Sequence, residues 1–217
     1  NNMTYLQLVN KVLIRLREDT VTSVNNDAYS LLIGEFVNDA IRQVEDSWDW
    51  SALRSTLIIT TQDDVYNYTL TGSGNNSKVL SAINDTSNNF INYQTQIWFS
   101  KAFLISDINK GDPNSYTFDS TDANGDTRIK VYPVPNKAYS LHFDMVLRSD
   151  TVSTDTAIIK LPTSPIIHLA QAMAVRERGE SGAQSTAELF FTADRTLSDA
   201  IALDAAKHPE ETIFTVG

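Results

Sequence analysis

The sequence predicts an α+β fold in which N- and C-terminal helix pairs form a four-helix bundle with an inserted antiparallel β region. Apolar residues recur at helical spacing near both ends of the chain, whereas the middle holds short β-branched and aromatic runs between clusters of small polar residues. The terminal helices must bury their apolar faces, and packing them together is the simplest solution. We expect a helical hairpin at residues 1–50, the β region at 51–160, a helix pair at 161–208 and a tail at 209–217.

The N-terminal part of the chain predicts two amphipathic helices. In the first, at about residues 4–17, Thr4 and Gln7 fit a capping box and the apolar residues have helical spacing: Leu6, Val9, Val12, Leu13 and Leu16. A polar turn leads into a second helix that ends near Ser47. Its apolar stripe comprises Ile33, Phe36, Val37, Ala40, Ile41, Val44 and Trp48. We therefore expect Trp48 to be buried and its replacement by alanine to cost about 3–5 kcal/mol.

The middle of the chain predicts a β region of short strands. Runs rich in β-branched and aromatic residues occupy residues 53–61, 66–70, 78–83, 90–93, 97–104, 115–118, 128–132 and 139–147. Asn124 and Gly125 lie between two of these runs. This dipeptide tolerates the positive φ angles of a tight turn, so we expect a hairpin there.

The C-terminal part predicts a second helix pair and a tail. Ser164 is expected to cap a helix that begins at Pro165 and stops near Gly179. The fourth helix spans about residues 184–207 and ends before Pro209. The tail beyond it keeps three apolar residues on a segment too short to form a core: Ile213, Phe214 and Val216. We expect a partner to bury them.

Composition and charge restrict the function. The 217 residues carry a formal net charge of -10 and include no cysteine, so disulfides, thiolate metal sites and cysteine nucleophiles are excluded. Proteins that grip nucleic-acid phosphates use clustered Lys and Arg, and an acidic chain does not fit that class. No run approaches the roughly 20 apolar residues that cross a bilayer. We expect synthesis in a cytoplasm and no membrane partner.

The sequence offers little for a metal or cofactor site. No pair of histidines has the i, i+4 spacing of a helical metal site: His142, His168 and His208. Residues 119–126 resemble a calcium loop, but alignment on Gly125 puts Ser120 and Val131 where carboxylates are needed. We therefore expect neither a metal nor a cofactor.

An enzymatic interpretation depends on acidic residues beside tryptophans at the end of the second helix. Glycosidic cleavage needs two carboxyl groups about 5–9.5 Å apart, and Glu45, Asp46 and Asp49 lie next to Trp48 and Trp50. The apolar stripe, however, buries Trp48 and points the acids outward, as in a solvated helix end. We therefore expect no enzymatic activity, and a cell-wall hydrolase is the less favoured alternative.

Several segments resemble the head-to-tail adaptor family of tailed bacteriophages, whose members are also called connector or tail tubular A proteins. The resemblance covers most of the chain. It rests on residues 6–17 (LQLVNKVLIRLR), 37–50 (VNDAIRQVEDSWDW), 128–136 (RIKVYPVPN), 139–147 (YSLHFDMVL) and 161–165 (LPTSP). As in that family, the second helix ends on aromatic residues and passes directly into a strand.

The resemblance implies a structural subunit of the virion neck. It implies a ring of twelve copies that docks on the portal protein, contacts a tail or nozzle protein through the β region, and lets genomic DNA pass without specific binding. It assigns portal docking to four residues of the C-terminal helix and tail: Leu203, Ile213, Phe214 and Val216. Besides the hydrolase, two alternatives stay open. One is another neck or tail component, such as a tail-completion or tail-tube protein; the other is a carbohydrate-binding module that uses Trp48, Trp50 and Trp98.

Overall fold

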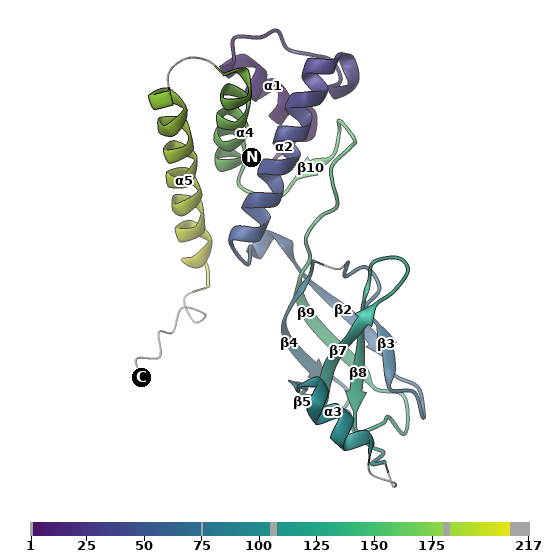
Figure 1. Ribbon diagram of the computed structural model, residues 1–217. Helices are drawn as coiled ribbons and strands as arrows, with labels where there is room; N and C mark the ends of the chain where they lie inside the picture. Colours follow the sequence, from purple (N-terminus) through teal and green to yellow (C-terminus); the bar gives the residue numbers. More distant parts are fainter. Residues whose placement is uncertain (1, 75, 105–107, 180–182, 209–217) are drawn as a thin grey trace. The chain divides into compact units, whose positions relative to one another are not determined.

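The computed structural model describes residues 2–74, 76–104, 108–179 and 183–208. Its contacts divide the chain into two units, each with its own apolar core (Figure 1). The helical unit comprises Asn1–Leu53 and Ser149–Gly217, and the β unit comprises Arg54–Arg148. The β unit is thus an insertion within the helical unit.

The helical unit combines four α-helices with a two-stranded sheet. Its described elements are β1 (Met3–Thr4), α1 (Tyr5–Arg15), the 3-10 turn η1 (Val24–Asn26), α2 (Ala28–Ser47), the 3-10 turn η2 (Ser51–Leu53), β10 (Ile158–Ile159), α4 (Thr163–Arg178) and α5 (Ala183–Ala205). Strand β1 pairs antiparallel with β10. This pairing joins the N-terminal end of the chain to the segment that leads into α4.

Residues close to the helix ends determine where α1 begins and where α4 ends, and the sequence predicted both. The capping box of α1 is confirmed, because the Gln7 backbone N–H donates to the Thr4 hydroxyl and the Thr4 N–H donates to the Gln7 amide oxygen. Gly179 ends α4 with a φ of 62°, a left-handed conformation that glycine adopts without strain. The predicted start of α4 at a Ser164 cap is wrong, since the helix begins at Thr163. Pro165 is tolerated in the first turn, where its missing N–H would have had no helical partner.

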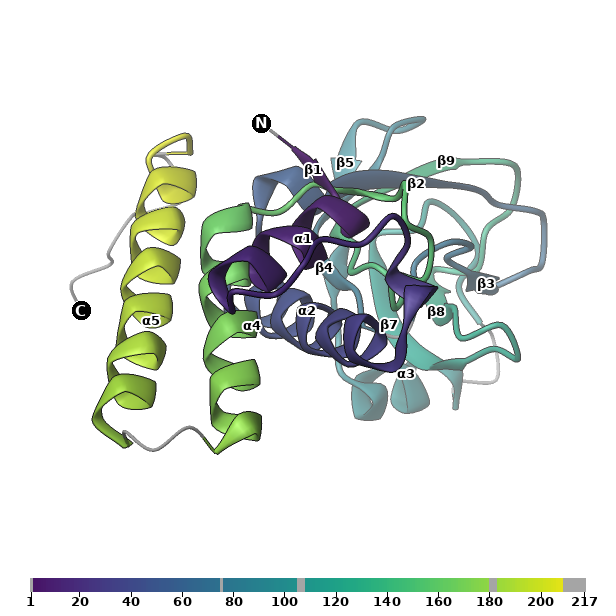
Figure 2. The same cartoon turned by 90° about the horizontal axis from the view of Figure 1, so that it is seen from above.

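The predicted four-helix bundle is also wrong. The described residues form five α-helices and ten strands in three sheets. Within the helical unit, α1, α2 and α4 contact one another, and α5 packs against α4, which lies between α5 and α1 in both views (Figures 1 and 2). An amphipathic stripe requires a partner surface but does not say how many neighbours supply it. For α5 that surface is mainly α4, so the unit is a three-helix core with an outer helix.

The β unit contains two four-stranded sheets that share one core. The first has the strand order β2-β9-β4-β5 and the second β3-β8-β7-β6. The strands are β2 (Arg54–Thr60), β3 (Asn67–Thr69), β4 (Lys78–Asn84), β5 (Asn89–Phe90), β6 (Asn92–Tyr93), β7 (Ser115–Thr121), β8 (Thr127–Tyr132) and β9 (Ser140–Val146). Strands β6 and β7 run parallel, so the second sheet is mixed, whereas the β region was expected to be antiparallel throughout. Tyr116 and Phe143 bring the two sheets into contact, with ring centroids 5.4 Å apart.

The expected hairpin at Asn124 and Gly125 is confirmed between β7 and β8. Gly125 has a φ of 86°. The Asp122 carboxylate accepts hydrogen bonds from the backbone N–H groups of Asn124 and Asp126, at 2.8 and 2.9 Å. These bonds hold the turn, as aspartate does in many tight turns.

The predicted strand at residues 97–104 is wrong, because this segment forms helix α3 (Gln96–Phe103). The Thr95 hydroxyl caps the helix by accepting from the Trp98 N–H. Phe99 and Ala102 are buried, which is helical spacing. A short aromatic run satisfies strand and helix patterns equally well, so its composition alone favoured the wrong element.

The prediction that Trp48, at the end of α2, is buried is wrong. Trp48 is partly exposed, whereas Trp50 is 1% exposed and lies in the core. The chain leaves the helix at Trp48, whose φ of -157° is extended, so the helical period no longer decides which side chain points inward. The expectation that the nearby acids point outward fails for Glu45, which is 3% exposed.

Gly34 marks a close approach inside the helical core. A Cβ at this position would lie 2.5 Å from the Tyr5 hydroxyl oxygen and 2.8 Å from Val24 Cγ1. Alanine normally stabilises a helix interior by about 1 kcal/mol relative to glycine. Here we expect Gly34→Ala to destabilise the protein by about 1–3 kcal/mol, because the overlap forces neighbouring side chains to move.

Chemical denaturation of the wild type and of Gly34→Ala measures this effect. The Tyr5→Phe background is the matched control, because it removes the closest contacting atom. The alanine should cost less in that background than in the wild type. Equal costs in the two backgrounds would contradict the assigned clash.

Candidate docking surfaces

Helix α5 presents large apolar side chains to solvent. Leu203 is 71% exposed and Phe191 is 69% exposed. Twelve residues separate them, which is about 18 Å along a helix axis. Leu203 is one of the four residues assigned to portal docking, and the other three lie outside the described residues: Ile213, Phe214 and Val216. The side chains of Leu203 and Phe191 are therefore accessible to a partner.

Phe191 was not identified from the sequence, although a signal was present. Phe190 and Phe191 are adjacent, and adjacent helical residues point about 100° apart. Only one of them can therefore face α4. Phe190 is the partly buried one and lies beneath Arg176, whose guanidinium carbon is 5.1 Å from the ring centroid.

A buried aspartate fixes the C-terminal end of α5. Asp204 is 6% exposed, and its carboxylate accepts three hydrogen bonds. The Ser51 hydroxyl donates at 2.5 Å, the Ser51 backbone N–H at 3.0 Å and the Trp48 indole N–H at 3.2 Å. These donors come from the end of α2 and from η2. Asp204 therefore ties the helix that carries Leu203 to the N-terminal segment of the chain.

The pKa of Asp204 reflects this anchoring. Burial by itself would raise the pKa of the carboxyl group, but the hydrogen bonds from Ser51 and Trp48 and the charge of Lys207 outweigh burial and lower it. Lys207 Nζ lies 3.6 Å from the carboxylate. Asp204 thus remains charged throughout the neutral range.

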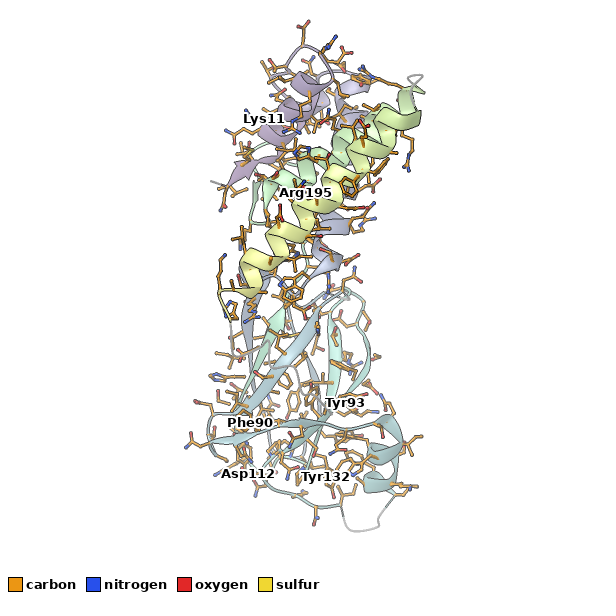
Figure 3. All side chains as sticks on the ribbon, turned by 90° about the vertical axis from the view of Figure 1, so that its left-hand side faces the viewer. Lys11, Phe90, Tyr93, Asp112, Tyr132 and Arg195 are labelled. Atoms are coloured by element: carbon orange, nitrogen blue, oxygen red, sulfur yellow. The ribbon has the colours of Figure 1, made fainter. Side chains whose placement is uncertain are left out.

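The β unit presents a second exposed apolar surface. Tyr93 packs against Tyr116 and Phe118, with ring centroids 5.8 Å apart in both pairs. Phe90 is 70% exposed and Tyr93 is 53% exposed (Figure 3). We define Phe90, Tyr93 and Phe118 as the aromatic surface of the β unit. Partly exposed tyrosine and phenylalanine are enriched in protein–protein interfaces.

A cavity of about 360 Å³ opens beside α3 in the same unit. Its lining combines three aromatic residues with Ile108 and with polar side chains: Tyr66, Phe99, Phe103, Gln96, Ser100 and Lys130. Lys130 Nζ lies 2.6 Å from the Asp119 carboxylate and lowers the pKa of that group. Asp119 therefore offsets the charge of Lys130, and the cavity lining mixes aromatic with polar groups.

The acids beside the tryptophans do not form an open sugar site. Glu45 is buried and accepts hydrogen bonds from the backbone N–H and the hydroxyl of Ser149. Trp50 lies in the core and is unavailable to stack on a sugar. The indole N–H of Trp48 is directed at Asp204. This helix end holds the helical unit together.

The three histidines lie in separate environments. His142 Nε2 is 3.1 Å from the Ser140 hydroxyl and 4.0 Å from the Asp85 carboxylate. His168 Nδ1 is 3.0 Å from Arg15 Nη1, and burial together with the Arg15 charge lowers the pKa of this histidine. His208 follows the end of α5, where its backbone N–H donates to the Ala205 carbonyl. Among the described residues, no group of three or more potential ligands is placed to hold a metal ion.

The described helices also include none that is both long and apolar enough to cross a membrane. In a comparison with known protein families, the model of the family described as SU10 adaptor protein matches residues 3–209. No curated protein matches the sequence. The family match spans both units and α5.

Proposed function

The chain belongs to the SU10 adaptor protein family, a family of phage head-to-tail adaptors, and we propose that it forms a ring that docks on the portal protein and joins it to the tail. The family makes it a component of the virion neck and indicates a structural rather than a catalytic protein. The ring is expected to hold twelve copies. Genomic DNA passes through its channel.

The observation that carries the portal contact is the exposure of Leu203 on a helix whose end is fixed. Asp204 holds the C-terminal end of α5 against the end of α2 through hydrogen bonds from Ser51 and Trp48. A fixed helix presents Leu203 in one orientation, so little conformational entropy is lost on binding. The portal surface buries Leu203 together with Ile213, Phe214 and Val216 of the tail that follows.

The aromatic surface of the β unit is proposed to contact the tail or nozzle protein. Phe90 and Tyr93 lie on the two-residue strands β5 and β6, at the edges of the two sheets. Short edge strands limit uncontrolled strand addition, and their side chains remain available for a specific contact. An adaptor needs two binding surfaces, and each unit of this chain supplies one.

The acidic composition supports passage of DNA without specific binding. A net charge of -10 repels phosphates, whereas every Lys or Arg contact would add affinity and slow the duplex. With this function, the protein is made in the host cytoplasm and ends up in the neck of the virion.

Leu203→Asp is expected to weaken portal docking by roughly tenfold or more, because a charge replaces an apolar contact at the interface. Deletion of residues 210–217 should have an effect of the same direction. Both expectations are tested by immobilising the purified cognate portal protein on a surface and titrating each variant over it to obtain the dissociation constant. The fold should be unchanged, since Leu203 is 71% exposed.

Ile58→Asp is the matched control, because Ile58 is a 62% exposed apolar residue on β2 of the β unit. It should bind the portal protein like the wild type. Wild-type docking by both Leu203→Asp and the deletion would contradict the assignment of portal binding to α5 and the tail.

A further inference from the structure

Two helices that lie on either side of α4 carry exposed faces of opposite charge. Helix α4 lies between α1 and α5 in both views of the helical unit (Figures 1 and 2). Figure 3 marks Lys11 on α1 and Arg195 on α5. A ring of identical copies is built from two different surfaces of each copy, one meeting the other on the next copy. Helices α1 and α5 are therefore two separate elements that can supply these two different surfaces.

The exposed face of α1 is basic around one apolar side chain. Ile14 is 55% exposed, and the exposed Lys11 and Arg15 lie beside it. Helix α1 contains no acidic residue. Glu18, just beyond the helix, forms an ion pair with Arg178, whose Nη2 lies 2.5 Å from the Glu18 carboxylate. We define Lys11, Ile14 and Arg15 as the basic face of α1.

The positive charge of Arg15 on this face affects His168 on the neighbouring helix α4. Arg15 Nη1 lies 3.0 Å from His168 Nδ1 and 3.2 Å from the Gln171 side-chain oxygen, so its contacts on α4 are with uncharged groups. The Arg15 charge, after burial, helps to lower the pKa of His168. A cation with neutral partners retains its capacity to attract an acid from another molecule.

The outward face of α5 has the complementary pattern. Phe191 is 69% exposed, and the exposed Glu188 and Asp194 lie three residues before it and three after it. Residues three apart are neighbours on a helix surface, so both acids flank the ring. Arg195 also neighbours the ring, four residues after Phe191, but Asp199 follows Arg195 at the i, i+4 spacing at which opposite charges offset each other, so the surroundings of Phe191 remain acidic in sum. We define Glu188, Phe191 and Asp194 as the acidic face of α5.

We propose that the basic face of α1 in one copy binds the acidic face of α5 in the next copy, with Ile14 against Phe191 at the centre. This inference rests on the proposed ring and identifies the surface through which neighbouring subunits recognise each other. The central apolar pair excludes water, and the charges around it select the correct partner face and register. Like faces repel, which disfavours symmetric dimers that would block ring closure.

Charge reversal on one face at a time tests the contact. In Lys11→Glu with Arg15→Glu, the α1 face becomes acidic; in Glu188→Lys with Asp194→Lys, the α5 face becomes basic. Each double variant alone should assemble on the portal protein with the half-assembly concentration raised roughly tenfold or more, because attraction becomes repulsion at every subunit contact. Mass measurement of full-length protein mixed with the cognate portal protein gives the number of copies bound.

An equal mixture of the two double variants should assemble again. In an alternating ring, the reversed α1 face meets the reversed α5 face at one contact, and the two unaltered faces meet at the other. Recovery in the mixture cannot result from loss of folding in either variant. Phe191→Ser should weaken assembly of an otherwise unaltered chain, with an unchanged thermal midpoint.

Lys101→Glu with Lys160→Glu is the matched control for the α1 variant, since it makes the same change in net charge at two exposed positions that belong to neither face. It should assemble like the wild type. Normal assembly by both face variants, or no recovery in their mixture, overturns this contact and leaves the proposed function standing. If the wild type itself never forms a ring on the portal protein, the proposed function fails and this contact falls with it.

Discussion

Replacing Trp50 with alanine is expected to lower the free energy of unfolding by about 3–5 kcal/mol. Trp50 is 1% exposed and belongs to the core of the helical unit. Its indole N–H donates to the Val44 carbonyl oxygen at 2.6 Å, which satisfies an acceptor near the end of α2. The alanine variant loses the ring contacts, leaves a cavity and removes this hydrogen bond. Denaturant titration followed by circular dichroism measures the change.

Trp48→Ala is the matched comparison, because it removes the same side chain two residues earlier. Trp48 is only partly buried, so we expect a cost of about half that of Trp50→Ala. The apolar stripe of α2 predicted the full cost of about 3–5 kcal/mol for Trp48→Ala. If Trp48→Ala proved the more destabilising of the two, the stripe would be right and the placement of Trp50 in the core would be wrong.

The helices of the helical unit could be predicted because their signals are local. The residues that cap α1 are three positions apart, and Gly179 ends α4 through its own backbone conformation. The apolar stripes of α1 and α2 lie within single segments, and the structure buries most of their members, with Leu6, Phe36 and Trp48 only partly buried. Such features depend on near neighbours in the chain, so one sequence suffices to find them.

Features that depend on distant residues could not be predicted in the same way. The apolar stripe of α5 indicates burial against some surface, but the sequence does not say that α4 is the main one. The parallel pairing of β6 with β7 joins Asn92 to Ser115 across an intervening helix. Helix α3 was mistaken for a strand because a short run of aromatic residues fits both periods.

The difference between local and long-range signals also explains why Leu203 was predicted at the candidate docking surface and Asp204 was not. Leu203 was assigned through the family resemblance, and its exposure is a property of the helix. Asp204, the next residue, was not identified, because its partners Trp48 and Ser51 lie more than 150 positions earlier in the chain. A single acidic residue on a polar helix gives no sign that it is buried.

Asp204→Ala is expected to destabilise the helical unit by about 2–4 kcal/mol, because it leaves the partly buried donors of Ser51 and Trp48 without this acceptor. The loss should be concentrated in α5. Hydrogen exchange of the α5 amides should quicken more than that of α2, since α5 depends on this anchor and on α4. Portal docking should weaken as well, because Leu203 is no longer held in one orientation. Unchanged exchange in α5 would contradict the anchoring role.

The charge of Asp204 predicts a specific dependence on pH. Its pKa in the folded protein is lowered below the ordinary value, so its stabilising contribution is fully present above the pKa of the unfolded chain, about 3.9. That contribution is lost as the pH falls through the lowered folded-state pKa. Asp204→Asn keeps the size of the side chain but cannot titrate, and comparison with it removes the effect of the other carboxylates. The stability difference between wild type and Asp204→Asn should be constant from pH 7 to about 5 and shrink below about 4. A difference that stayed constant to acid pH would mean that the anchor works by shape alone and that the negative charge contributes nothing to holding α5.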